Sequence, residues 1–298
     1  PALAEARRAA QAAVSVSNLR QLNTVVATYA GENKDSFVNP FQRGTPWPWW
    51  GVLPAQYANQ TGGFATWNFN DGVRYTELFS AHWGSLVMAY IDEFDLENPI
   101  QFAPGDTTVI ARFRKNLATR VAPIEELSWD GSYFYSPTMW ISPDRYRTAN
   151  LVAMGFAGDT LLRRNRIDNV IHPSAKVMVW ERFDFQRIGR RSFPAGGGRA
   201  KLFPNWNNPE ASPRFGLVDG SVDSIPISRL DQLTAATNTN TRLRDELTPS
   251  GTWAIPQATM QKFDMHQDDL EYGPPNNYTF KQYFWATRNG VQGRDIPR

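Results

Sequence analysis

The first thirty residues carry a helical pattern. Residues 2–30 contain neither glycine nor proline, and seven of the first thirteen residues are alanine, which has the highest helix propensity of any residue. Gly31 follows at a position where helices often end. The pattern predicts one helix over residues 1–31, about 45 Å long at a rise of 1.5 Å per residue.

The two halves of this predicted helix differ in side-chain size. Up to Ser17 most apolar side chains are small, which allows another helix to approach closely. The candidate helix-contact positions are Pro1, Leu3, Ala6, Ala10, Ala13 and Ser17. A stripe of larger side chains then recurs at spacings of three and four, typical of a helix that packs on a sheet; it consists of Leu19, Leu22, Val26 and Tyr29. We expect the first half to contact other helices and the second half the protein's own core. The alternative is an alanine-rich amphipathic helix without a special role.

Two later segments predict β-structure. Residues 176–183 alternate between two faces after a turn at His172-Pro173-Ser174. Residues 214–225 form two apolar runs around Asp219-Gly220, a pair that favours a type I′ hairpin turn with positive φ at both residues. We assign Asp219 and Gly220 to turn geometry rather than to catalysis. The sequence therefore predicts an α+β fold in which a long N-terminal helix packs on an antiparallel sheet.

The remaining segments give weaker indications of secondary structure. An apolar face over residues 76–94 predicts a second helix, and the chain after Arg229 is polar and loop-like. We divide the chain into the helix at 1–31, an α+β domain at 32–229 and a loop-rich extension at 230–298.

Composition and charge exclude several classes of function. The 31 basic and 29 acidic residues give a net charge of +2, without the clustered basic excess typical of nucleic-acid binders. The chain has no cysteine, which excludes disulfides and thiolate chemistry. Motif searches find no HExxH metal site, Gly-x-Ser-x-Gly elbow or phosphate-binding loop, and we expect no enzymatic activity.

A resemblance to one family rests on separated motifs. Pro1 to Gln11 resembles the segment that follows the apolar stretch of bacterial type IV prepilins and type II secretion pseudopilins. Residues 17–22, with Tyr29-Ala30 and Glu32-Asn33, resemble the continuation in the large pilin-like proteins abundant in planctomycetes. Asp219-Gly220 is similar to their C-terminal histidine–aspartate–glycine hairpin motif. Pro209 and Ser221 stand where that family usually has histidines, so no histidine site is carried over.

The resemblance implies a structural role. It implies a subunit of a type IV pilus-like or type II secretion pseudopilus filament in the cell envelope, with other copies of itself or other pilin subunits as partners. It also implies that an apolar segment preceding Pro1 anchors the intact protein in the inner membrane before assembly.

Two rival functions and one metal site stay open. A surface carbohydrate-binding module would use Trp47, Trp49 and Trp50 as glycan contacts, because indole rings stack on sugars. A hydrolase would need a pair of carboxylates that the sequence does not identify. Asp268, Asp269 and Glu271 are candidate calcium ligands, although their spacing matches no EF-hand loop.

Overall fold

A single long helix and a four-stranded sheet organise the protein. The computed structural model describes residues 2–39, 52–54, 64–66, 83–91, 98–106, 131–152, 161, 165–187, 204–254 and 279–298. Helix α1 spans Ala2–Glu32, about 46 Å at 1.5 Å per residue. The helix runs through Gly31 and ends one residue later, where Lys34 and Asp35 take positive φ values of 57° and 58°. The amide of Asp35 then donates to the Ala30 carbonyl over 2.8 Å and closes the helix end.

The central sheet is antiparallel throughout, with the strand order β3-β4-β5-β6. Its strands are β3 (Tyr133–Tyr135), β4 (Val177–Glu181), β5 (Arg214–Leu217) and β6 (Val222–Ser224). The β4–β5 register shifts between Val177 and Val179. The predicted α+β fold, with a long N-terminal helix on an antiparallel sheet, is confirmed.

Short elements surround this sheet. Two further antiparallel pairs are β1 (Val52–Pro54) with β2 (Phe64–Thr66) and β7 (Thr252–Ala254) with β8 (Thr279–Lys281). The short α-helices are α5 (Ile227–Leu233) and α6 (Thr241–Leu247). The 3-10 helices are η1 (Trp83–Tyr90), η3 (Pro99–Gln101), η4 (Pro137–Met139), η5 (Pro143–Tyr146), η6 (Ile167–Asn169) and η9 (Gly290–Gln292).

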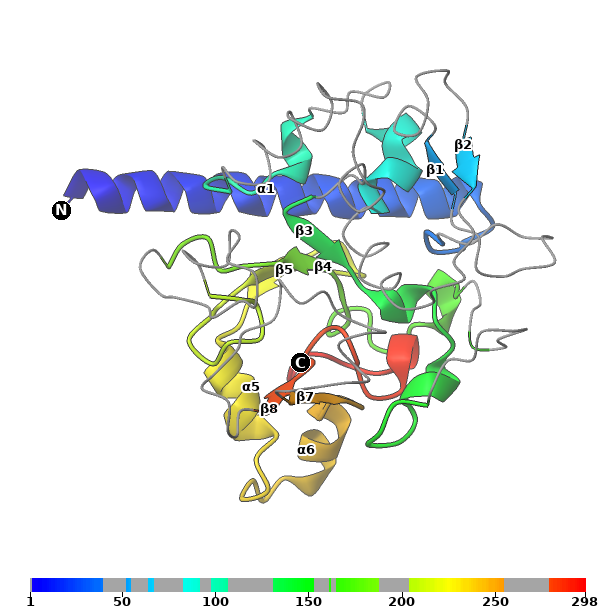
Figure 1. Ribbon diagram of the computed structural model, residues 1–298, viewed down its shortest axis with the longest axis vertical. Helices are drawn as coiled ribbons and strands as arrows, with labels where there is room; N and C mark the ends of the chain where they lie inside the picture. Colours follow the sequence, from blue (N-terminus) through cyan, green and yellow to red (C-terminus); the bar gives the residue numbers. More distant parts are fainter. Residues whose placement is uncertain are drawn as a thin grey trace.

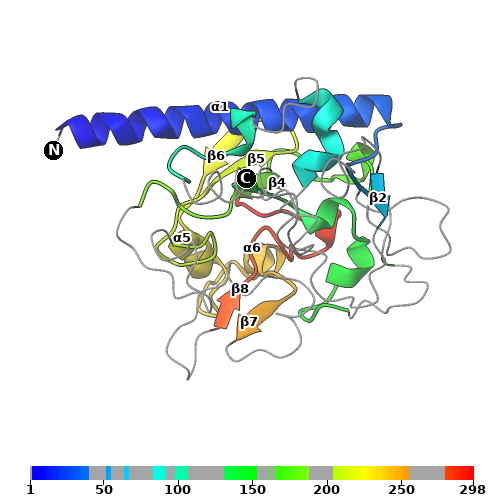
Figure 2. The ribbon, with the colours of Figure 1, turned by 45° about the horizontal axis from the view of Figure 1, so that its top comes forward.

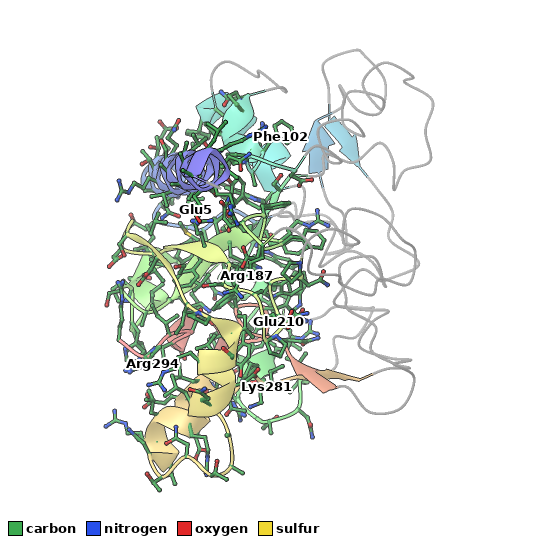
Figure 3. The ribbon with its side chains drawn as sticks, turned by 90° about the vertical axis from the view of Figure 1, so that its left-hand side faces the viewer. Glu5, Phe102, Arg187, Glu210, Lys281 and Arg294 are labelled. Atoms are coloured by element: carbon green, nitrogen blue, oxygen red, sulfur yellow. The ribbon has the colours of Figure 1, made fainter. Side chains whose placement is uncertain are left out.

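The sheet is covered on both faces. Figures 1 and 3 show α1 along one face, with α5, α6 and the C-terminal residues on the opposite side. The alternation in β4 explains this arrangement, because neighbouring strand residues point to opposite faces. Glu181 bonds to Ser15 of α1, whereas its neighbour Trp180 lies 6.1 Å from Trp206 and 6.2 Å from Trp285, ring centroid to ring centroid. All five residues of β4 are consequently buried.

The C-terminal segment belongs to this core. Lys176, just before β4, is fully buried, and its Nζ donates to Asp295 Oδ2 over 2.9 Å and to Thr287 Oγ1 over 2.6 Å. Asp295 Oδ2 also accepts the Val177 amide over 2.9 Å. Burial lowers the pKa of Lys176, and the Asp295 carboxylate opposes that shift. The polar, loop-like character expected after Arg229 therefore misses most of α5, all of α6 and buried residues near the C-terminus such as Asp295 and Ile296.

The predicted second helix differs from the structure where it can be compared. Within 76–94 the structure describes residues 83–91, and Trp83–Tyr90 form the 3-10 helix η1, which Val87 interrupts with φ −118° and ψ 18°. Gly84 lies so close to the Gln101 side chain that a Cβ would approach its Oε1 to 2.8 Å. This close packing against η3 competes with the regular α-helix that the apolar pattern favours.

Candidate functional site

The N-terminal part of α1 is an exposed arm, which we define as residues 2–14. No residue of the arm is buried, Leu3 is 85% exposed and Val14 is 49% exposed. Figures 1 and 2 show this end of the helix extending beyond the rest of the protein. Residues 2–10, 13 and 14 are exposed, and Gln11 and Ala12 are partly buried. The arm is therefore about 20 Å of helix with little cover, at 1.5 Å per residue.

The predicted contact positions lie along this arm and just beyond it. Leu3, Ala6, Ala10, Ala13 and Ser17 are all exposed, and spacings of three and four place them on one face of the helix. The Ser17 hydroxyl bonds to Gln21 Nε2 over 3.2 Å. Pro1 lies outside the described residues. Because the side chains of Ala6, Ala10, Ala13 and Ser17 are small, this face permits close approach of another helix.

Charged residues flank the small ones. Glu5, Arg7 and Arg8 are exposed, and Arg8 Nε donates to the Ala4 carbonyl over 3.3 Å. In Figure 3, Glu5 is labelled on the end of α1 that points towards the viewer. The arm thus carries a net charge of +1.

The arm ends at a buried chain of hydrogen bonds. Ser15 is the first buried residue of α1, and its hydroxyl donates to Glu181 Oε1 over 2.5 Å. Tyr133 OH lies 3.0 Å from Ser15 Oγ, and Asn18 Nδ2 donates to Tyr133 OH over 3.4 Å. Because the Ser15 proton is given to the carboxylate, Tyr133 acts as donor to Ser15 Oγ. The chain Asn18–Tyr133–Ser15–Glu181 therefore runs in one direction and terminates at the carboxyl group of Glu181.

Glu181 accepts the last bond of this chain and contacts Arg214. Its Oε2 accepts the Arg214 amide over 2.9 Å, and Arg214 Nη1 lies 3.5 Å from Oε1. Burial raises the pKa of Glu181, while Arg214 and the Ser15 hydroxyl act against that rise. Burial also raises the pKa of Tyr133 far above its ordinary value, so Tyr133 stays a hydrogen-bond donor across the physiological range.

Two further polar contacts fix α1 on the body. Asn18 Nδ2 also donates to the Phe102 carbonyl over 3.1 Å. Asn23 lies against Gly216 of β5, where a Cβ would collide with the Asn23 amide group, and Asn23 Nδ2 is 3.5 Å from the Ser221 carbonyl. These contacts define both the rotation of α1 and its position along the sheet, because each needs one particular residue of the helix.

The apolar stripe is confirmed. Leu19, Leu22 and Val26 are at most 1% exposed and belong to the core. Tyr29 packs edge-on against Tyr90, with ring centroids 5.7 Å apart. The second half of α1 is thus the anchor, and the arm is the part left for other contacts.

The hairpin turn is confirmed in place but not in type. Gly220 has a φ of 85°, whereas Asp219 is not among the residues with positive φ, so the predicted type I′ turn is wrong. The Leu217 amide bonds to the Ser221 carbonyl and the Gly220 amide to the Leu217 carbonyl, which encloses a three-residue loop with a left-handed glycine last. Asp219 Oδ1 accepts the Ser221 amide over 2.9 Å, a local bond that serves the turn.

The other candidate residues are not placed. Trp47, Trp49, Trp50, Asp268, Asp269 and Glu271 lie outside the described residues. Within the described ranges, no group of three or more His, Asp or Glu residues is arranged to hold a metal ion. The tryptophans whose exposure the structure gives are buried; they are Trp83, Trp140, Trp180, Trp206 and Trp285.

The comparisons with known proteins identify no relative. No family model, curated protein or solved structure matches the chain. In the described part of the chain, no helix combines the length and the apolar character needed to cross a membrane.

The sequence did not predict the polar contacts between α1 and the sheet. Ser15, Asn18 and Asn23 face the sheet although they are polar, and Glu181 is a fully buried carboxylate. A signal was present, since Ser15, Asn18 and Asn23 lie three to five residues apart along the same side as Leu19 and Leu22. Their partners on β3, β4 and β5 lie more than a hundred residues away and could not be paired from the pattern alone.

Proposed function

We propose that this chain is a structural subunit of a pilin-like filament and that it assembles through the exposed arm of α1. The observation that carries the proposal is the contrast along one helix. From Ser15 onward α1 is fixed to the body by buried contacts, whereas none of residues 2–14 is buried.

Two physical arguments support an assembly role for the arm. In proteins most helical stability comes from packing one face of the helix against other elements, and none of residues 2–14 is buried within the chain. A row of Ala6, Ala10 and Ala13 also offers little apolar area alone but allows backbones to approach closely when two helices meet. The arm is therefore suited to helix–helix contact between copies.

The resemblance at Pro1–Gln11, residues 17–33 and Asp219-Gly220 agrees with this proposal. By that resemblance the intact subunit would carry a preceding apolar segment, reside in the cell envelope and join other pilin subunits.

Substitution within the arm tests the proposed function. Ala10→Glu places a charge on the contact face, and we expect it to abolish filaments visible by electron microscopy of cells that produce the intact protein. Ala27→Glu is the matched control, because Ala27 is exposed on the same helix but lies over the body. Normal filaments with Ala10→Glu, together with unchanged folding by circular dichroism, would refute an assembly role for the arm.

A further inference from the structure

A second exposed apolar group lies at the opposite end of α1. Among the described residues, the exposed large apolar side chains include Ile167 at 38% and Ile171 at 64%. Their loop is joined to the end of the helix, because the Ile167 amide donates to the Asp35 carbonyl over 2.9 Å and Ser36 bridges to Arg166. We call Asp35, Arg166, Ile167, Asp168 and Ile171 the end patch.

The end patch and the arm carry opposite charge. Arg166 Nη2 lies 3.4 Å from Asp35 Oδ2 and 3.5 Å from Asp168 Oδ2, and the three side chains are between 49% and 61% exposed. Two aspartates and one arginine give the patch a net charge of −1. The arm, with Glu5, Arg7 and Arg8, has a net charge of +1. Each surface therefore offers exposed apolar side chains beside charges that the other complements.

We propose that the arm of one copy docks on the end patch of the next copy. The inference rests on the proposed function, that the chain assembles, and adds the surface that receives the arm. Leu3 and the end patch lie about 44 Å apart along the helix, at 1.5 Å per residue. A contact between two different surfaces at opposite ends is heterologous, and such contacts extend into an open chain of copies unless their rotation closes a ring.

Apolar and charged side chains have different roles in this contact. Leu3 and Val14 bury apolar area against Ile167 and Ile171, which supplies the attraction. Exposed ion pairs contribute little affinity, so Arg7 and Arg8 facing Asp168 serve to select the partner and its orientation.

Cysteine pairs test the contact directly, because the chain contains no cysteine of its own. Copies with Leu3→Cys are mixed with copies with Ile171→Cys under mild oxidation, and disulfide-linked dimers are resolved by gel and mass spectrometry. A disulfide requires Cα atoms within about 7 Å, so we expect a mixed disulfide that joins a Leu3→Cys copy to an Ile171→Cys copy. Copies with Arg229→Cys, an exposed position on α5, are the control and should give only background product with Leu3→Cys.

Charge exchange gives an independent test. We expect Arg7→Glu/Arg8→Glu in the Leu3→Cys copies to suppress the mixed disulfide at least tenfold, since the arm then repels the patch. Adding Asp168→Arg to the Ile171→Cys copies reverses the charge of the patch and should restore the mixed disulfide. Asp245→Arg on α6 is the matched control, because Asp245 is an exposed aspartate paired with a neighbouring arginine, as Asp168 is.

The outcomes separate this inference from the proposed function. Two results would overturn arm-to-patch docking without contradicting arm-based assembly. In the first, copies associate in sedimentation experiments but form disulfides only between two Leu3→Cys copies. In the second, the charge substitutions leave the yield of mixed disulfide unchanged. Copies that show no association at any concentration, with no filaments from the intact protein, would contradict the proposed function as well.

Discussion

Ser15→Ala tests whether the buried hydrogen-bond chain helps to fix α1 to the body from Ser15 onward. The substitution removes the 2.5 Å bond from the Ser15 hydroxyl to Glu181 Oε1 and leaves Tyr133 OH without its acceptor. A hydrogen bond to a charged group contributes about 1.5–3 kcal/mol, and a buried polar group left unsatisfied costs about 1–3 kcal/mol. These contributions overlap, because both pass through the one hydroxyl. We therefore expect the free energy of unfolding to fall by about 2–4 kcal/mol.

The assay is urea unfolding followed by tryptophan fluorescence and circular dichroism, which must give coincident transitions for a single free energy to be defined. Ser17→Ala is the matched control, since Ser17 lies two residues along the same helix and is exposed; surface changes of this kind usually stay within about 0.5 kcal/mol. Amide exchange of residues 15–18 should also accelerate in Ser15→Ala.

A double-mutant cycle sharpens the test. Tyr133→Phe removes the hydroxyl that Ser15→Ala leaves unsatisfied, so the two substitutions together should cost less than the sum of the single ones. Equal stability of Ser15→Ala and Ser17→Ala, or strict additivity with Tyr133→Phe, would refute the reasoning.

Three other substitutions test buried contacts of the core and of α1 with the sheet. Lys176→Met leaves the buried Asp295 carboxylate without its ion-pair partner and should lower the free energy of unfolding by about 3–5 kcal/mol in chemical denaturation. Adding Asp295→Asn should recover part of this loss. A double variant no more stable than Lys176→Met would contradict the buried Lys176–Asp295 pair. Gly216→Ala places a methyl group against the Asn23 amide. It should lower the melting temperature and reduce the free energy of unfolding by about 1–3 kcal/mol, and Asn23→Ala should restore part of this loss. A Gly216→Ala variant as stable as the native protein would disprove the close contact. Because the pKa of Glu181 is raised in the folded protein, the folded state binds the Glu181 proton more readily than the unfolded state does. The contribution of Glu181 to stability should therefore fall as pH rises from about 4.5 through the raised pKa. Denaturation at several pH values should show this fall in the free energy of unfolding for the native protein and not for Glu181→Gln.

The parts of the fold that depend on local pattern could be predicted from the sequence. The helix, its stripe of Leu19, Leu22 and Val26, and the alternation of β4 follow from periodicities of 3.6 and 2.0 residues. The Asp219-Gly220 turn was also found, but its type was wrong. The dipeptide suits either a two-residue or a three-residue loop, and the pairing of Leu217 with Ser221 decides between them.

Features that depend on distant partners could not be predicted. The polar residues Ser15 and Asn23 lie on the buried side of α1 because Glu181 and Gly216 meet them there, over more than 160 residues of sequence. The C-terminal segment appears polar because uncharged polar residues and charged residues recur along it. Its Asp295 is nevertheless buried by pairing with Lys176, more than a hundred residues earlier.

The central claim is that the exposed arm is the surface through which copies assemble. The most direct measurement compares the maleimide labelling rate of Ala10→Cys in free and assembled protein, with Arg229→Cys on α5 as the reference position. The account predicts that Ala10→Cys reacts rapidly when free and becomes strongly protected on assembly, while Arg229→Cys reacts equally in both states. Equal labelling of Ala10→Cys in the two states would contradict it.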